Sequence, residues 1–240
     1  MLFRRIASHV RDQNWTAVFI DFVIVVVGVF IGLQVANWNE AKQREAEAER
    51  LLETLVVDLA EVREVLVWQQ ERYTLYIDTL DDLMDALESD APVSEAFAGE
   101  SLTTILNFHL PPDLPLSFQD MLSAGRLDRL QSSAVRDGLR DYAAQVSLTQ
   151  RATGLLSQSF LDALDRMRPY IGFERPDELS EAFDALRVDR VDIEGLRETG
   201  IGLTALTQLY QGHRNMLSIV AQLIVDLDTA QQTITGGSAD

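Results

Sequence analysis

The sequence predicts an all-α protein in which an N-terminal transmembrane helix runs into an antiparallel bundle of long helices. Three observations support this fold class. Residues 15–38 form an apolar run, apolar residues recur every three or four positions over three long segments, and no alternation of apolar and polar residues is long enough to predict a strand. Long stripes separated by turn signals are typical of an up-and-down bundle. A coiled-coil oligomer is the alternative, but the turns favour packing within one chain.

The apolar run is long enough to cross a bilayer. Trp15 and Trp38 stand at its ends, and at about 1.5 Å per residue they lie roughly 34 Å apart, near the two faces of a membrane. A secretory signal peptide has a shorter apolar region followed by a cleavage site. We therefore interpret the run as an uncleaved anchor. The expected membrane-interface residues are Trp15, Trp38, Arg4, Arg5 and Arg11.

The flanking charges predict how the anchor is oriented. Lys and Arg favour the cytoplasmic side, whereas acids have little influence, and three arginines with the terminal amine precede the run while three basic residues, Lys42, Arg44 and Arg50, follow it. A short N-terminal tail ahead of a large domain also favours a cytoplasmic N-terminus. We expect a cytoplasmic N-terminus in a bacterial inner (plasma) membrane and a periplasmic or extracytoplasmic C-terminal domain. The predicted parts are an amphipathic interfacial segment at 1–14, a transmembrane helix at 15–38, an extracytoplasmic helical bundle at 39–233 and a flexible tail at 234–240.

One face of the apolar run combines an acid with small residues. At about 100° per residue, six side chains project within one narrow sector: Asp21, Val25, Gly28, Gly32, Ala36 and Asn39. Gly28 and Gly32 form a GxxxG motif, and small residues let helices approach closely in lipid, where an ionisable residue usually faces protein or water. This face is predicted to pack on another membrane helix. Alternatively, the glycines are incidental and Asp21 reaches the lipid headgroups.

Turn signals divide the rest of the chain into further helices. Pro92 disfavours a helical residue before it, Ser94 and either Ser132 or Ser133 have the side chain of an N-cap, and Gly125 fits a left-handed C-cap. The predicted helices cover 39–88, 94–108, 117–124, 133–168, 178–186 and 203–233, the first being continuous with the membrane helix and the last following Gly200 and Gly202. Prolines make residues 109–116 a stiff extended connector.

Two further patterns refine these helices. Ser117 and Asp120 have the spacing of a capping box. The last helix carries the most regular apolar stripe in the chain, formed by Leu203, Leu206, Tyr210, His213, Leu217, Val220, Ile224 and Leu227. We expect this stripe to face the core of the bundle.

The composition excludes several classes of chemistry. A net charge of −18 repels the phosphate backbone of nucleic acids, and the absence of cysteine excludes disulfides, thiolate metal sites and cysteine nucleophiles. The three histidines lack the spacing of a local metal motif. The sequence therefore predicts no catalytic, cofactor-binding or metal-ligating residue. The acids Asp78, Asp81, Asp82 and Asp85 are interpreted as a solvated helix face rather than a cation site.

Two other features have both a structural and a functional interpretation. His213 lies on an apolar stripe, where a core histidine with one hydrogen-bond partner is more common than a ligand. The turn between the helices at 117–124 and 133–168 is a possible interaction corner, although surface ion pairing is the simpler role. Its residues are Ser123, Gly125, Arg126, Asp128 and Arg129.

The chain resembles a family of uncharacterised bacterial membrane proteins of unknown function. The similarity lies in Asp21 followed by "VGVFIGLQVANWNE" at 27–40, which has the form GxxIGxQVxNWNE, and in the "L-S-x-G-x-L" turn at 122–127. Asp21 stands where Glu is usual, which keeps the acid but shortens its reach. The resemblance implies a single-pass helical protein and supplies no activity.

These observations favour a non-enzymatic protein that needs no cofactor. We expect the bundle to bind a protein or ligand and the membrane helix to contact a homo-oligomer partner or another membrane protein. The alternative is an accessory subunit of a larger membrane complex. A metal-dependent or hydrolytic enzyme is the least favoured interpretation.

Overall fold

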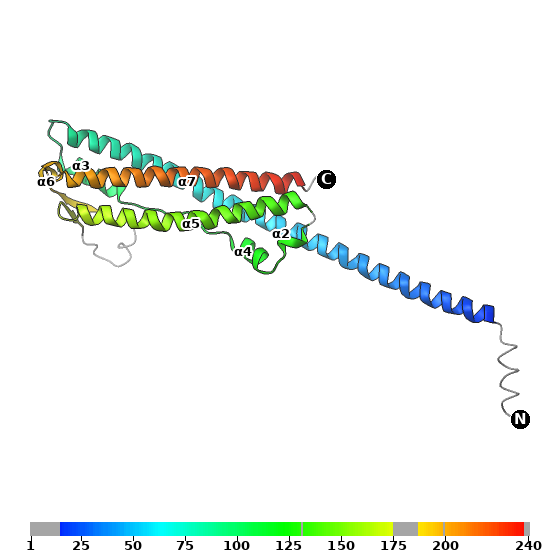
Figure 1. The fold of residues 1–240 in the computed structure, drawn as a ribbon. Helices are drawn as coiled ribbons and strands as arrows, with labels where there is room; N and C mark the ends of the chain where they lie inside the picture. The colour runs from blue at the N-terminus through cyan, green and yellow to red at the C-terminus, as the bar shows by residue number, and fades with distance from the viewer. Residues whose placement is uncertain (1–14, 131, 175–186, 199, 238–240) are drawn as a thin grey trace, which may run out of the picture. The chain divides into compact units, whose positions relative to one another are not determined.

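The computed structural model describes residues 15–130, 132–174, 187–198 and 200–237 (Figure 1). The chain divides into two compact units, residues 1–51 and residues 52–240. Helix α2 covers Trp15–Glu88, so the first unit consists, in its described residues, of the beginning of this helix. The predicted interfacial segment at 1–14 and the predicted helix at 178–186 lie outside the described residues.

The second unit is a bundle of long helices, which confirms the predicted all-α fold class. After α2 come α3 (Glu95–Ile105), α4 (Leu116–Ser123), the short 3-10 helix η1 (Leu127–Arg129) and α5 (Ser133–Met167), and the chain ends with α6 (Ile193–Glu198) and α7 (Ile201–Gly237). Helices α5 and α7 lie side by side and run in opposite directions (Figure 1). Helix α7 continues into residues 234–237, which the sequence assigned to a flexible tail, and Ile234 is buried.

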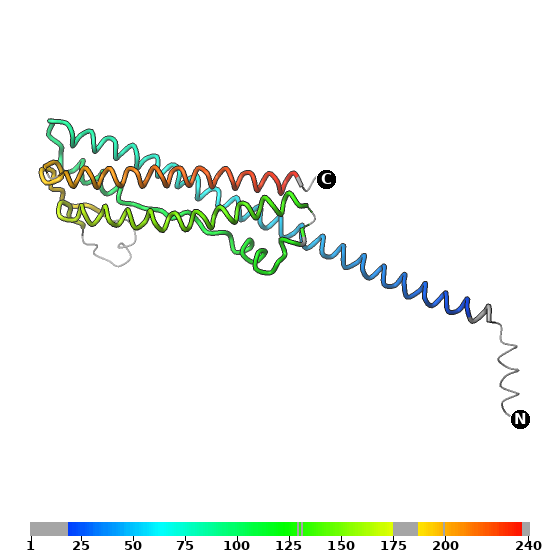
Figure 2. The backbone as a smooth tube through the Cα atoms, viewed as in Figure 1, coloured from blue at the N-terminus to red at the C-terminus, as the bar shows by residue number. Residues whose placement is uncertain are grey.

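An extended segment, and not a helix, makes the return between α2 and α5. Within the bundle these two helices run in the same direction, and residues 106–115 travel back along them between α3 and α4 (Figure 2). We call this segment the connector. Its end residues Leu106 and Pro115 bond to the adjoining helices, and residues 107–114 between them are neither helix nor strand, as the prolines predict. Its backbone polar groups must therefore find partners among side chains or solvent.

Two of the predicted helix starts have the expected local cause. The Ser94 hydroxyl accepts a hydrogen bond from the Phe97 amide at 3.2 Å, and the Ser132 hydroxyl accepts one from Val135 at 3.3 Å. Each bond satisfies an amide that the first helical turn leaves without a partner. Gly125 follows α4 with φ 62°, the left-handed conformation in which glycine avoids a steric penalty.

The capping box at Ser117 is not formed. Helix α4 begins one residue earlier, at Leu116, with Pro115 in the cap position and no side-chain cap. Proline suits this start because its fixed φ is compatible with a helix and it has no amide hydrogen to satisfy. The Ser117 hydroxyl instead donates a hydrogen bond to the Asp58 carboxylate on α2, so it joins α4 to the bundle.

The sequence prediction missed a small antiparallel hairpin. Strands β1 (Ile171–Phe173) and β2 (Val188–Val191) pair with Ile171 opposite Val191. Strands this short leave no recognisable alternation in the sequence. The hairpin is fixed to α3, because Val188 donates its amide to the Thr103 hydroxyl at 3.0 Å and Val191 donates its amide to the Glu95 carboxylate at 3.2 Å.

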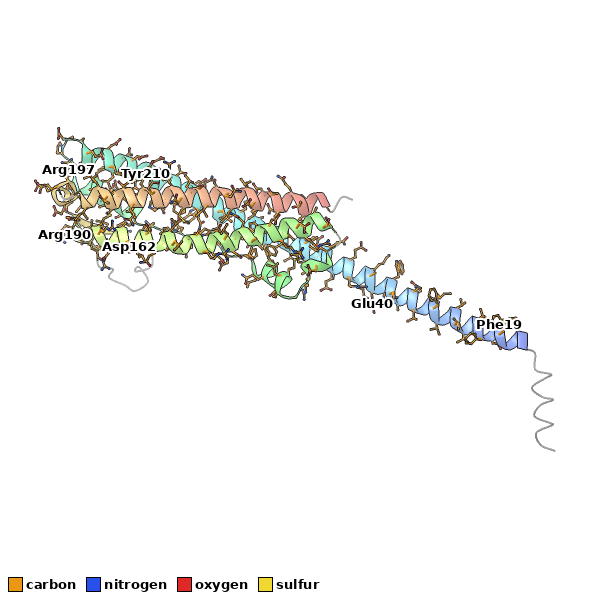
Figure 3. The ribbon with its side chains drawn as sticks, in the orientation of Figure 1. Phe19, Glu40, Asp162, Arg190, Arg197 and Tyr210 are labelled. Atoms are coloured by element: carbon orange, nitrogen blue, oxygen red, sulfur yellow. The ribbon has the colours of Figure 1, made fainter. Side chains whose placement is uncertain are left out.

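An apolar cluster of the bundle surrounds the end of α2. It combines buried residues of α2, α3, α5, the hairpin, α6 and α7, among them Leu80, Leu83, Leu102, Ile105, Met167, Leu196 and Leu206. Arg197 of α6 completes this end (labelled in Figure 3), because its guanidinium donates to the carbonyls of Ala86, Leu87, Ser89 and Ala91 at 2.8–3.1 Å. These bonds satisfy carbonyls for which a helix end has no internal partner.

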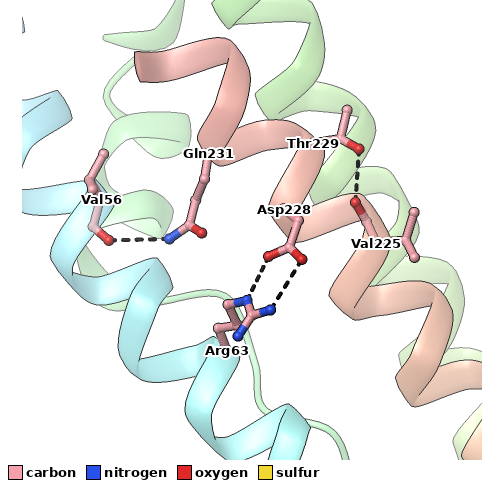
Figure 4. A network of polar contacts seen from close by, with 6 residues as sticks. All are labelled: Val56, Arg63, Val225, Asp228, Thr229 and Gln231. Atoms are coloured by element: carbon pink, nitrogen blue, oxygen red, sulfur yellow. Dashed lines mark hydrogen bonds and ion pairs between the residues drawn. The ribbon is translucent and has the colours of Figure 1, made fainter. Parts of the chain in front are cut away.

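Polar contacts join α2 and α7 elsewhere along the bundle (Figure 4). The Arg63 guanidinium binds the Asp228 carboxylate through two bonds of 2.6 and 3.3 Å. Three residues further along α7, the Gln231 amide donates to the Val56 carbonyl at 3.4 Å. Helix α7 is thus held by α2 as well as by α5.

Candidate functional site

The beginning of α2 exposes an apolar surface. An 18-residue window of this helix is long and apolar enough to cross a membrane, and none of it is buried in the structure. Large side chains are exposed around the helix, including Phe19, Phe22, Ile24, Phe30, Ile31 and Leu33. The core helix of a water-soluble protein buries such residues, whereas this stretch leaves them uncovered.

The predicted packing face lies on this exposed stretch. Asp21, Val25, Ala36 and Asn39 are exposed on α2. A Cβ atom added at Gly28 or Gly32 would meet no atom within 4 Å, so no described part of the chain uses the space above these glycines. The contact of this face with a second helix stays a prediction.

The predicted interface residues are only partly described. Trp38 is exposed, and the Lys42 ammonium lies 4.4 Å from the centre of its ring, a distance at which a cation is attracted to the ring face. Trp15 begins α2, and its side chain is outside the described part. Arg4, Arg5 and Arg11 also lie outside the described residues.

The connector sits in a seat made by side chains of α2 and α7. Gln69 donates its amide to the Leu110 carbonyl at 2.7 Å. Tyr73 donates its hydroxyl to the His109 carbonyl at 2.6 Å and accepts the His109 amide at 3.0 Å. From α7, the His213 Nε2–H donates to the Ile105 carbonyl at 2.9 Å, just before the connector begins. We call Gln69, Tyr73, Tyr76 and His213 the connector seat.

Aromatic and imidazole rings surround these bonds. The His109 ring makes a 2.8 Å hydrogen bond with the Tyr76 hydroxyl and contacts the Trp68 ring edge-on, with 4.8 Å between centres. The His213 ring lies 5.7 Å from Tyr73 and 5.2 Å from Tyr76. One polar cluster thus joins both described histidines to α2.

Burial changes the acid–base properties of this cluster. It lowers the pKa of His213 to about 4 because a charged imidazole loses its hydration there, an effect that the bond to Ile105 only partly offsets. Burial also lowers the pKa of His109, and the nearby Arg72 lowers it further. Loss of hydration raises the pKa of Tyr73 and of Tyr76. All four groups are therefore neutral at pH 7.

Two atoms of the seat have no hydrogen-bond partner among the described residues. They are Nδ1 of His213 and Oε1 of Gln69, in side chains that are 1% and 3% exposed. Because Nε2 of His213 carries the hydrogen that it donates, Nδ1 presents a lone pair. His213 is thus a core histidine with one protein partner, as its stripe predicts. Gln69 was not identified from the sequence as a buried polar residue. The available signal was its spacing of three or four residues from Leu66 and Tyr73, which places it on the apolar stripe of α2.

The predicted interaction corner contains an internal ion pair. Asp128 binds Arg140 of α5, and both side chains are exposed, so Asp128 has the surface ion pairing that was the simpler interpretation. Gly125 has the left-handed conformation, and the Ser123 hydroxyl donates to the Asp120 carbonyl at 3.3 Å. Arg126 is half-buried, and the Arg129 side chain lies outside the described part. Binding of a partner here stays a prediction.

The described part of the bundle has surface hollows, two of which differ in their lining. One, of about 390 Å³, lies between α5 and α7 and has only uncharged lining residues, including Ser159, Gln208 and Asn215. The other, of about 870 Å³, lies between α3 and the hairpin and includes Glu95, Glu174 and Arg187. Among the described residues, no three His, Asp or Glu side chains are grouped so that they could hold a metal ion.

Comparisons with known proteins identify a family. The model described as "Family of unknown function (DUF6090)" matches residues 21–146, which is slightly more than half of the 240-residue chain. The match extends from Asp21 to Val146 in α5 and includes the connector. Comparisons with curated proteins and with solved structures gave no match.

Proposed function

Because the chain belongs to the Family of unknown function (DUF6090), whose description supplies no activity, we propose a function from the chain's own residues. The protein is a non-enzymatic, single-pass membrane protein. Its helical bundle binds a protein or ligand outside the cytoplasm, and its membrane helix packs on another helix, from a second copy or from a different membrane protein.

The observation that carries this proposal is the uncovered apolar stretch of α2. Its large side chains face outward on every side of the helix. Exposing one such side chain to water rather than burying it costs about 1.5–3 kcal/mol, so the whole stretch strongly favours an apolar surrounding. A bilayer supplies that surrounding along the length of a helix of this size.

The orientation of the anchor is tested by cysteine labelling. The natural chain has no cysteine, so Ser8→Cys and Ser147→Cys each introduce a single thiol, the second at an exposed position of α5. In intact spheroplasts a membrane-impermeant maleimide should label the Ser147→Cys protein, and it should label the Ser8→Cys protein only after lysis. The reverse pattern would contradict the proposed orientation.

The helix contact is tested by filling the space above the glycines. Gly28→Leu together with Gly32→Leu should reduce association in a membrane two-hybrid assay, because the added side chains keep two helices apart. Val26→Leu together with Phe30→Leu is the matched control, since these positions have the same spacing on the opposite side of the helix. Equal association of both double variants with wild type would reject the packing face.

A second candidate function is that of an accessory subunit. Asp21 within the apolar stretch favours it, because an ionisable residue in a membrane helix usually meets protein or water. This function requires co-purification in gentle detergent with a stoichiometric multi-span partner, and isolation as a lone homodimer would exclude it. Metal analysis of the same purified protein tests the least favoured alternative, a metal-dependent enzyme.

A further inference from the structure

We propose that the connector is an acid-released strap: protonation of His213 and His109 frees it from the connector seat while the long helices stay folded. This inference does not depend on the identity of any partner. It concerns a conformational change within the bundle.

Few side-chain bonds hold the seated part of the connector, residues 107–110, whereas further along Gln119 donates its amide to the Leu114 carbonyl at 2.7 Å. The backbone groups of Ile105, His109 and Leu110 are held by side chains of Gln69, Tyr73 and His213. The connector's three prolines have no amide hydrogen to donate. The helices on both sides, in contrast, satisfy most of their backbone groups internally. Loss of a few side-chain bonds therefore affects the connector far more than the helices.

His213 makes its hydrogen bond to the Ile105 carbonyl in the neutral form. Nε2–H already donates to Ile105, so an added proton goes to Nδ1, which has no partner among the described residues. The ring is 1% exposed, so water does not solvate the new charge. A buried charge without a partner is strongly unfavourable, and opening the seat to water removes that penalty.

The groups around the His109 and His213 rings are neutral or positively charged. On α2, Tyr73 and Tyr76 face His213, and burial raises the pKa of both hydroxyls, so they stay neutral. Phe160 of α5 faces the same ring. Arg72 of α2 repels a charge on His109, and a charge on His109 repels one on His213. No carboxylate among the described residues bonds to either ring, and the bond to the Ile105 carbonyl favours the protonated form of His213 by less than burial disfavours it.

His109 adds a second proton-sensitive contact. Its Nε2 lies 2.8 Å from the Tyr76 hydroxyl, and a neutral Nε2 without hydrogen accepts from that hydroxyl. A protonated ring donates instead, and the Tyr76 hydrogen then loses its acceptor. Protonation therefore weakens the seat at two points. One is the bond between the His109 ring, which belongs to the connector, and the Tyr76 hydroxyl; the other is the bond from His213 to the Ile105 carbonyl just before the connector.

Hydrogen exchange of the full-length protein in nanodiscs tests the strap. Between pH 7.5 and 5.0, the protection of amides 107–110 should fall on the order of 20-fold, after correction for the intrinsic pH dependence of exchange. The helical circular dichroism of the protein should change little over this range, because the long helices stay folded. A parallel loss of helical circular dichroism, or no loss of protection in the connector, would overturn the proposal.

Three histidine variants identify the groups responsible. His213→Gln keeps a side-chain N–H for the Ile105 carbonyl but does not titrate, and together with His109→Gln it should abolish the pH response. His9→Gln, which removes the chain's third histidine, should leave the response unchanged. If the double variant loses protection with pH as wild type does, carboxylates cause the change and the proposal is wrong.

Trp68 gives an independent measurement that needs no change in the seat. In protein carrying Trp15→Phe and Trp38→Phe it is the remaining tryptophan, and its ring contacts His109. A protonated imidazole quenches indole fluorescence, so the emission should change with a midpoint below pH 6.5. A midpoint at or above 6.5 would show that His109 titrates as in solvent and would contradict the seated strap.

Discussion

The two stretches of α2 differ in where their apolar residues point. Around Phe19–Leu33 the large apolar side chains are exposed on all sides, whereas between Leu55 and Leu87 they form a buried stripe and the rest of the helix is mainly polar. The second stretch buries its stripe against its own chain. The first stretch has no such partner in the described structure, so its sequence suits a surrounding that is apolar in every direction. One helix thus combines a stretch that is apolar on all sides with a stretch that is apolar on one face.

The largest expected difference between the two stretches is the effect of truncating an apolar side chain. Leu83→Ala should lower the free energy of unfolding of the bundle by about 3 kcal/mol, because Leu83 is 0% exposed and its removal leaves a cavity. Ile24→Ala is the matched change in the first stretch, where the side chain is 62% exposed. Urea unfolding in detergent micelles, followed by circular dichroism, measures both. Equal losses of unfolding free energy in Leu83→Ala and Ile24→Ala would contradict the difference between the two stretches.

The second prediction concerns a polar side chain of α7, His213, that packs against Tyr73 and Tyr76 of the buried stretch. The pKa of His213 is about 4 in the folded protein and 6.5 in a solvated chain. The unfolded chain therefore binds the proton more readily, and the folded protein loses stability as the pH falls from 6.5 to 4. The loss approaches about 3 kcal/mol at the lower limit, and no stability from this group is lost above pH 6.5.

His213→Gln should flatten this part of the stability profile. Urea unfolding at pH 7.5, 5.5 and 4.5 gives the comparison, and wild type should lose more stability than the variant at each step down. Because carboxylates also titrate near pH 4, the difference between the two proteins is the decisive quantity. Parallel profiles would show that His213 is solvated in the folded state.

The third prediction tests how the buried stretch ends. Arg197→Met removes the bonds to four carbonyls, two in the last turn of α2 and two just after it, and should lower the free energy of unfolding by about 1–3 kcal/mol. Arg197→Lys keeps the charge but reaches fewer carbonyls, so its loss should be intermediate. Thermal unfolding compares the three proteins. If the lysine variant is as unstable as the methionine variant, the geometry of the guanidinium, and not its charge, holds this end.

Apolar periodicity predicted the long helices and most of their buried faces. In α7, however, only half of the predicted stripe is fully buried, at positions seven residues apart: Leu206, His213, Val220 and Leu227. Between them the structure buries Leu209, Met216 and Leu223, each one residue before the predicted Tyr210, Leu217 and Ile224. The reason is that α7 contacts both α5 and α2. It buries a broader and rotated face, which a single stripe does not define.

The connector seat was beyond sequence reasoning for a different reason. Its bonds join side chains to backbone groups that are 36 to 108 positions away in the chain, and such bonds leave no periodic pattern. The prolines predicted the extended connector but not its course along the bundle. The hairpin was missed because its strands have three and four residues. The predicted packing face of the first stretch needs a partner and is testable only in a membrane.

The smallest expected effect comes from the ion pair between α2 and α7, near the start of the buried stretch. Arg63 and Asp228 make two hydrogen bonds, but both side chains remain well exposed, so water and salt screen their attraction. Arg63→Met and Asp228→Asn, with the double variant, form a double-mutant cycle. The coupling should be smaller than the loss caused by Arg197→Met and should decrease in 0.5 M NaCl. A large, salt-independent coupling would mean that this pair, and not burial of the leucine stripe, fixes α7 against the beginning of the buried stretch.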